Sequence, residues 1–207
     1  MRRQTPRPTA LAGAVLACCL VAGCTGDGGD EPSSQGSSSP SATGTTEPAE
    51  APEVEVVAKF GKVTGKIGKS DRSDVVDRVA GVVDEWLEAA YVAGDYPRAA
   101  SSYDETSWPG FTQGAARTAA ADKDLMANAD IADRIDGLTV KKREITVDVL
   151  AVGRTARAAT ARVKLAFATE GVDGGNEWKV TVTGRVFLTK KDGKWKVFGY
   201  DVAKARV

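Results

Sequence analysis

The side chains that could do chemistry in this chain are carboxylates and tyrosines, because the sequence contains no histidine. Without histidine, the Ser–His–Asp and Cys–His arrangements that activate a nucleophile cannot form. Histidine-ligated zinc, copper and iron sites are excluded too, and three cysteines are too few for a four-cysteine zinc site. No Asp-x-Asp-x-Asp-Gly run predicts a calcium loop. We therefore expect no metal and no cofactor, and acid–base catalysis by an Asp or a Tyr is the enzymatic chemistry that remains.

Cys24 follows an N-terminal segment that is typical of a secretory signal. Three arginines, Arg2, Arg3 and Arg7, precede an uncharged and mostly apolar run over residues 10–22. This run is far shorter than the ~20 residues that a membrane-spanning helix needs, so it predicts an export signal and not a membrane span. The residues that lead up to the cysteine are small or aliphatic: Val21, Ala22 and Gly23.

The sequence Val21-Ala22-Gly23-Cys24 resembles the lipobox of bacterial lipoproteins. The resemblance implies that residues 1–23 are removed and that Cys24 becomes the lipid-bearing first residue. We therefore expect the protein on the outer face of the cell membrane, held there by its N-terminal lipid. The alternative is an ordinary secretory signal in which Cys24 has no special role. Either way no disulfide is expected, because Cys18 and Cys19 would leave with the signal.

Composition divides the remaining chain into a tether over residues 24–53 and a single domain over residues 54–207. Residues 25–53 contain no Val, Ile, Leu, Met or aromatic residue and are rich in Ser, Thr, Gly, Pro and acids, which predicts a disordered spacer with a reach of roughly 30 Å. The precursor has 28 basic and 28 acidic residues, and removal of three arginines leaves a net charge of −3. This balance argues against a nucleic-acid partner.

Helical periodicity predicts three helices in the first half of the domain. The first follows a cap at Asp71 or Ser73 and ends at Gly94. Its apolar stripe is formed by Val76, Val79, Val83, Trp86, Leu87 and Ala90.

Two shorter helices are expected to follow. Asp95 as a cap and Pro97 in the first turn predict a short helix that ends near Tyr103. An alanine-rich segment over residues 115–129 predicts the third helix.

Period-two alternation predicts strands in the rest of the domain. An N-terminal strand is expected over residues 54–67, and four more follow over 138–152, 155–169, 178–188 and 194–202. The alternation of apolar and polar residues shifts by one position between Val140 and Ile145, which predicts a bulge or bend. Asp192-Gly193 predicts a tight hairpin. Apolar residues on both faces of the last strand predict a place inside the sheet. Trp86, Trp178 and Trp195 are expected in the core.

The predicted fold class is α+β, with three N-terminal helices packed on a strongly bent antiparallel sheet of about four strands, plus the extra N-terminal strand. This order of helices and strands along the chain resembles that of the nuclear transport factor two-like superfamily, the cone-shaped fold of ketosteroid isomerase and polyketide cyclases. Residues 85–91, Gly94-Asp95-Tyr96 and the closing strand 192–201 carry the resemblance. The resemblance implies a pocket between helices and sheet, where the candidate lining residues are Tyr91, Tyr103, Asp104 and Trp108, with Tyr96, Asp148 and Arg162 as further polar groups.

Three functions remain open at this point. The first is a membrane-anchored domain that binds a small apolar ligand or an envelope protein without catalysis. The second is an isomerase, cyclase or dehydratase that uses a buried Asp or Tyr. The third is an accessory subunit of a cell-envelope transport assembly.

Two basic clusters are expected on the surface of the domain. Lys141-Lys142-Arg143 and the lysines around the last hairpin are interpreted as solvated charges, with contact to anionic lipid headgroups as the alternative.

Overall fold

Five strands form one mixed sheet in the order β1-β2-β3-β4-β5. The computed structural model describes residues 54–207, so the expected signal, lipobox and tether lie outside the described residues. Strands β2 to β5 are antiparallel neighbours, whereas β1 runs parallel to β2. The α+β class is confirmed, with a sheet of five strands: β1 (Val57–Thr64), β2 (Ile135–Val152), β3 (Thr155–Gly171), β4 (Lys179–Lys191) and β5 (Lys194–Arg206).

Strand β1 is shorter than the predicted 54–67 segment and its pairing with β2 is interrupted. The register shifts between Phe60 and Val63, and the Lys62 N–H donates to the Asp148 carboxylate at 2.7 Å. Asp148, considered above as a further polar group of the expected pocket, is half-buried and also pairs with Arg162 at 3.3 Å. This carboxylate therefore satisfies a backbone donor that the irregular strand leaves unpaired.

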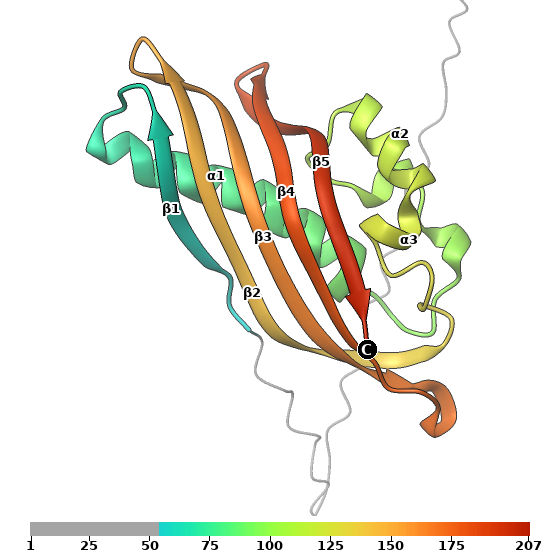
Figure 1. The fold of residues 1–207 in the computed structure, drawn as a ribbon. Coiled ribbons are helices and arrows are strands. Elements are labelled where there is room, and N and C mark those ends of the chain that lie inside the picture. The colour runs from blue at the N-terminus through green and yellow to red at the C-terminus, as the bar shows by residue number, and fades with distance from the viewer. Residues whose placement is uncertain (1–53) are drawn as a thin grey trace, which may run out of the picture. The chain divides into compact units, whose positions relative to one another are not determined.

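Helix α1 (Lys69–Leu87) carries the predicted apolar stripe and lies across one face of the sheet (Figure 1). It continues as a π-helix, η1 (Glu88–Val92). The predicted caps are wrong, because the helix begins earlier: Gly68 is the N-cap and no side chain caps the first turn. Asp71 instead lies within that turn, where a negative charge complements the helix dipole.

The predicted helix between Asp95 and Tyr103 is wrong. Between these residues the chain forms only one single turn, η2 (Ala100–Ser102), and a second turn, η3 (Glu105–Ser107), follows after Tyr103. The Arg98 N–H donates to the Ala132 carbonyl at 2.7 Å, so this backbone donor is used by a distant segment and not by a helix. The capping residues Asp95 and Pro97 favour a helix locally, but this tertiary hydrogen bond stabilises a different backbone conformation.

The predicted helix over residues 115–129 is divided. Helix α2 (Gln113–Ala121) ends at Asp122, and α3 (Lys123–Met126) follows as a single turn. Asp122 accepts a hydrogen bond from the Tyr200 hydroxyl of β5 at 2.8 Å. The break thus lies where the helical segment is joined to the sheet.

Strand β5 is an edge strand, which corrects the prediction that it lies inside the sheet. Its pairing with β4 shifts register between Phe187 and Leu188, opposite Gly199 and Val197. This irregularity reverses the alternation. Trp195 and Val197 are buried before it, Phe198 at the bulge is 53% exposed, and Tyr200 and Val202 pack against the core after it. The apolar residues on both faces of β5 therefore result from a bulge and not from burial of the strand on both sides.

The other strand predictions hold. The register shift between Val140 and Lys142 confirms the bulge in β2, and Asp192 and Gly193 form the β4–β5 turn with positive φ angles of 52° and 77°. Trp86 and Trp195 are buried as predicted, whereas Trp178 is only partly buried and lies against two arginines.

Candidate functional site

The residues expected to line a pocket are packed into the core or lie on the surface. Tyr91 is 0% exposed, and its hydroxyl donates to the Leu125 carbonyl at 2.5 Å. Trp86 packs edge-on against the Tyr91 ring at 5.8 Å and donates its indole N–H to the Met126 carbonyl at 3.2 Å. Both polar atoms are thus used to hold α3 against the end of α1 and η1.

Asn128 extends the same closed arrangement. Its side-chain amide donates to the Tyr91 carbonyl at 2.7 Å and to the Tyr96 hydroxyl at 3.2 Å. On β5, Lys204 reaches the loop with its ammonium and donates to the carbonyls of Asp124 and Ala127 at 2.6 and 2.8 Å. We call Trp86, Tyr91, Asn128 and Lys204 the closed end of the domain.

Tyr103 and Trp108 are buried in the connecting segment. The Arg98 guanidinium lies 4.1 Å from the Tyr103 ring centroid, and the Tyr103 hydroxyl lies near Tyr96 without a well-formed hydrogen bond. Asp104 is exposed and accepts from the backbone and hydroxyl of Thr106, and these hydrogen bonds lower the pKa of its carboxyl. Three of the four predicted lining residues are therefore buried, and the fourth, Asp104, is exposed.

The buried tyrosines are poor acid–base groups at neutral pH. Burial raises the pKa of Tyr91 well above its ordinary value, and burial also raises the pKa of Tyr103. A tyrosine whose pKa rises stays protonated, so neither side chain can accept a proton as a general base. The pKa of the Asp104 carboxyl is lowered, so this group remains an exposed carboxylate.

Arg143 is the residue whose environment departs most from its sequence interpretation. It was predicted to be a solvated charge, yet its side chain is 5% exposed. Its guanidinium pairs with Asp84 of α1 at 2.5 Å and with Glu88 of η1 at 2.7 Å. Burial raises the pKa of Asp84, while Arg143 opposes that rise. The bulge next to Arg143 and the two acids one helical turn apart were the sequence signals for this cluster.

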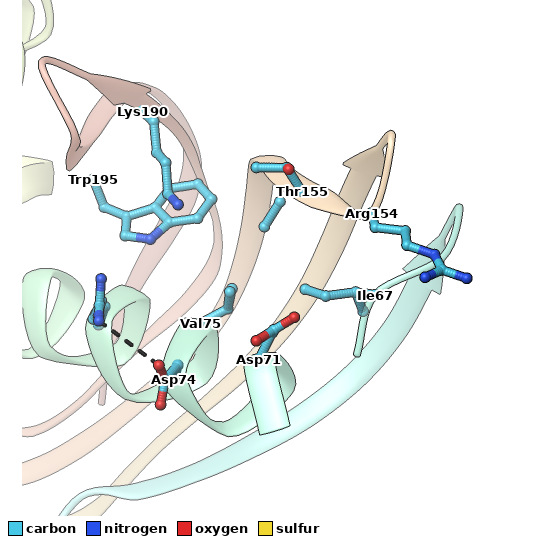
Figure 2. Close-up of a pocket in the computed structure, with 10 residues that line it drawn as sticks. Ile67, Asp71, Asp74, Val75, Arg154, Thr155, Lys190 and Trp195 are labelled. Carbon is cyan, nitrogen blue, oxygen red and sulfur yellow. Dashed lines mark ion pairs between the residues drawn. The ribbon is translucent and has the colours of Figure 1, made fainter. Parts of the chain in front are cut away.

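A cavity lies at the opposite end of the sheet, where the β2–β3 and β4–β5 hairpins approach the start of α1. Its volume is about 220 Å³. Figure 2 shows side chains from α1, from the β2–β3 turn and from both strands of the β4–β5 hairpin around this space. We call it the hairpin-end cavity, and its lining residues are Ile67, Asp71, Asp74, Val75, Arg78, Arg154, Thr155, Ala156, Lys190 and Trp195.

Trp195 forms one wall of the hairpin-end cavity, and its polar atom has no partner. The residue is 4% exposed, and no oxygen in the described part of the chain accepts from its indole N–H. An unsatisfied buried donor costs about 1–3 kcal/mol. The Lys190 ammonium lies over the same ring, 5.3 Å from its centroid. Trp195 was predicted to be plain core, and sequence gave no signal for its unpaired N–H.

Charged groups surround the apolar walls of the cavity. Asp74 is paired with Arg78 at 3.7 Å. Arg154 lies at the β2–β3 turn with a φ of 67°, and within residues 54–207 no carboxylate oxygen approaches Arg154 or Lys190 to within 4.0 Å. A second hollow shares Ile67, Asp71 and Arg154 with this cavity and adds the cations Lys66 and Arg72.

Within residues 54–207, no helix is both long and apolar enough to cross a membrane, and no cluster of His, Cys, Asp and Glu side chains could hold a metal ion. Comparisons of the chain with protein-family models, with curated proteins and with solved structures found no match. Any functional assignment therefore rests on the geometry of the domain itself.

Proposed function

We propose that this protein is a lipid-anchored extracytoplasmic lipoprotein whose domain binds a small ligand without chemical conversion. Cys24 carries the lipid, residues 24–53 act as the tether, and residues 54–207 form a cone-shaped binding domain. The ligand site is the hairpin-end cavity, and the space between α1 and the middle of the sheet serves as core.

One observation carries the proposal: several buried polar atoms in residues 54–207 lack a hydrogen-bond partner, the Trp108 N–H among them, but only the Trp195 N–H belongs to a residue that lines the hairpin-end cavity. Binding sites in proteins are concave, partly apolar and supplied with a few polar groups that orient the ligand. The hairpin-end cavity has these properties. An enzyme that used the buried tyrosines would need them to meet its substrate, and both are sealed by packing.

A fragment screen by protein NMR tests the ligand site. Fragments of about seven heavy atoms should shift the methyl signals of Ile67, Val75 and Ala156 while leaving the core methyls of Val79 and Leu165 in place. Shifts centred on Tyr103 and Trp108 would contradict the proposed site. Conversion of any bound fragment into a product would contradict the proposal of binding without catalysis.

The lipid anchor needs a separate test in cells. Replacing Cys24 with Ser should abolish lipid attachment, so the protein moves from the detergent phase to the aqueous phase after phase separation. Cys19→Ser, in the expected signal, is the matched control and should partition into the detergent phase as the wild-type protein does. A Cys24→Ser protein that stays in the detergent phase with its signal removed would exclude this anchor.

A further inference from the structure

The hairpin-end cavity combines an apolar interior with an excess of positive charge at its edge. Ile67, Val75, Ala156 and the Trp195 ring are apolar surfaces that line it. Together with the hollow that adjoins it, the cavity is bordered by two carboxylates, Asp71 and Asp74, and by five cations: Lys66, Arg72, Arg78, Arg154 and Lys190. One of the carboxylates is already paired with Arg78.

We propose that this cavity binds a small amphipathic carboxylate, whose apolar body occupies the cavity and whose carboxylate lies between Lys190 and the Trp195 N–H. This inference rests on the proposed function, because it assigns a ligand class to the same site. A carboxylate oxygen is an acceptor, which is the group that the Trp195 N–H lacks. A charge-assisted hydrogen bond from Lys190 would hold the second oxygen, whereas Arg154 extends away from Trp195 past Ile67 (Figure 2) and adds positive charge at the edge.

The size of the cavity limits the ligand. A volume of about 220 Å³ corresponds to roughly seven water-sized groups at ~30 Å³ each. A six-carbon acid fits this space, whereas a phospholipid with full acyl chains does not. The neighbouring hollow of about 560 Å³ is open and polar at Lys66 and Arg72, so it offers room for a polar extension.

Lys190 is the side chain that moves when the ligand enters. Its stem is flexible, its residue is exposed, and its ammonium rests over the Trp195 ring (Figure 2). The indole N–H is screened from water in this arrangement. Displacement of Lys190 from the ring opens the cavity wall, and the displaced ammonium is then available to the ligand carboxylate.

The positive end of α1 supports the same ligand charge. Gly68, the N-cap, offers no side-chain acceptor to the first-turn N–H groups, and it lines the adjoining hollow together with Gly65. The Asp71 carboxylate lies close to Gly68 and occupies part of this positive region. The helix end therefore adds positive charge beside the cavity, and the ligand carboxylate itself is expected at Lys190, on the side formed by the β4–β5 hairpin.

Hexanoate, hexylamine and hexanol are matched probes for this proposal. Each would be titrated into the domain while the methyl signals of Ile67, Val75 and Ala156 are followed by NMR. Hexanoate should bind at least tenfold more tightly than hexylamine or hexanol. Inorganic phosphate, which has charge but no apolar body, should not shift the methyl signals.

Two variants test the named contacts. Lys190→Met should weaken hexanoate binding about fivefold, and Trp195→Phe about tenfold. Arg162→Gln is the control, because Arg162 is an exposed cation paired with Asp148 and does not line the cavity. Its hexanoate affinity should be unchanged. Equal effects from Arg162→Gln and Lys190→Met would overturn the proposal, because they would show only long-range charge attraction.

The outcomes separate the two proposals. Binding of hexylamine or hexanol at the cavity methyls without binding of hexanoate would keep the proposed site and overturn the carboxylate assignment. Shifts of the same size with phosphate would also overturn it, because charge alone would then suffice. No methyl shift at Ile67, Val75 or Ala156 with any of the four probes would overturn both the ligand class and the site.

Discussion

The two ends of this domain use the same kinds of side chain in opposite ways. At the closed end, the Trp86 N–H donates to Met126, and the Lys204 ammonium donates to the carbonyls of Asp124 in α3 and Ala127 just after it. At the hairpin-end cavity, the Trp195 N–H has no partner within residues 54–207, and the Lys190 ammonium lies over the Trp195 ring without an ion pair to a described carboxylate. Paired groups stabilise the fold, whereas unpaired groups at a cavity wall are free to bind a ligand.

Trp86→Ala should give the largest effect and would show how much the closed end stabilises the domain. Trp86 is fully buried and packs against Tyr91 and Phe111, with ring centroids 5.8 Å away in each case. Truncation of a buried tryptophan removes its packing and leaves a cavity, which costs about 3–5 kcal/mol of unfolding free energy. Urea denaturation measures this loss. Trp178→Ala, at a partly buried position, is the control and should cost clearly less.

Arg143→Met should cost about 2–3 kcal/mol at neutral pH, because it leaves Asp84 and Glu88 without their cation. Both acids are about one-third exposed, so water screens part of the penalty. Lys142→Met is the matched control. Lys142 is exposed and pairs only with Glu144, so its loss should change stability by less than about 1 kcal/mol.

The same variant has a pH dependence with a defined sign. Burial raises the pKa of Asp84 in the folded protein, so folding binds a proton and the contribution of this group to stability falls as the pH rises from the unfolded pKa toward the raised folded value. Arg143 opposes that rise. Arg143→Met should therefore raise the Asp84 pKa further, and its deficit should shrink on acidification toward about pH 4. A deficit that does not change with pH would contradict the ion-pair account.

Lys204→Met should cost about 1–3 kcal/mol, because the carbonyls of Asp124 in α3 and Ala127 just after it lose a buried donor. The Lys204 side chain is 6% exposed, and its ammonium also pairs with Asp130 at 2.5 Å. Faster amide exchange in the loop over residues 124–130 is the specific readout. Lys196→Met, on the same strand, should leave loop exchange unchanged.

Trp195→Phe should have the smallest effect on stability, less than about 1 kcal/mol. This result would show that the Trp195 N–H, unlike the paired groups of the closed end, does not stabilise the fold. The substitution keeps an aromatic ring and removes a donor that has no acceptor. The equivalent change Trp86→Phe removes a donor that does have one, so it leaves the Met126 carbonyl unpaired. Equal losses in the two variants, measured by urea denaturation, would contradict the distinction between the two ends.

Sequence periodicity predicts the parts of this fold that follow from local rules. The apolar stripe of α1 and the alternation in β2 and β3 were visible because each element buries one face. The Asp192-Gly193 turn was predictable because its two positive φ angles favour these residue types. The bulge in β5 could not be predicted, because a reversal of the apolar–polar alternation cannot be told from burial of the strand on both faces.

The candidate site could not be predicted because its properties depend on tertiary pairing. Arg143 in a basic run looks solvated until Asp84 and Glu88 approach it from another element. Trp195 looks like core, and it is buried, but only the surrounding structure shows that its N–H lacks an acceptor. Tyr91 and Tyr103 looked like pocket groups because the family resemblance placed a pocket there, and packing fills that space instead.

The most direct test of the account is a nitrogen–proton NMR spectrum of the tryptophan indole groups during a titration with hexanoate. We predict that the Trp195 indole signal moves with saturation, because its N–H gains an acceptor, and that the Trp86 signal stays in place, because its N–H is already bonded to Met126. Movement of Trp86 with Trp195 unaffected would contradict the central claim that the closed end packs and the hairpin-end cavity binds.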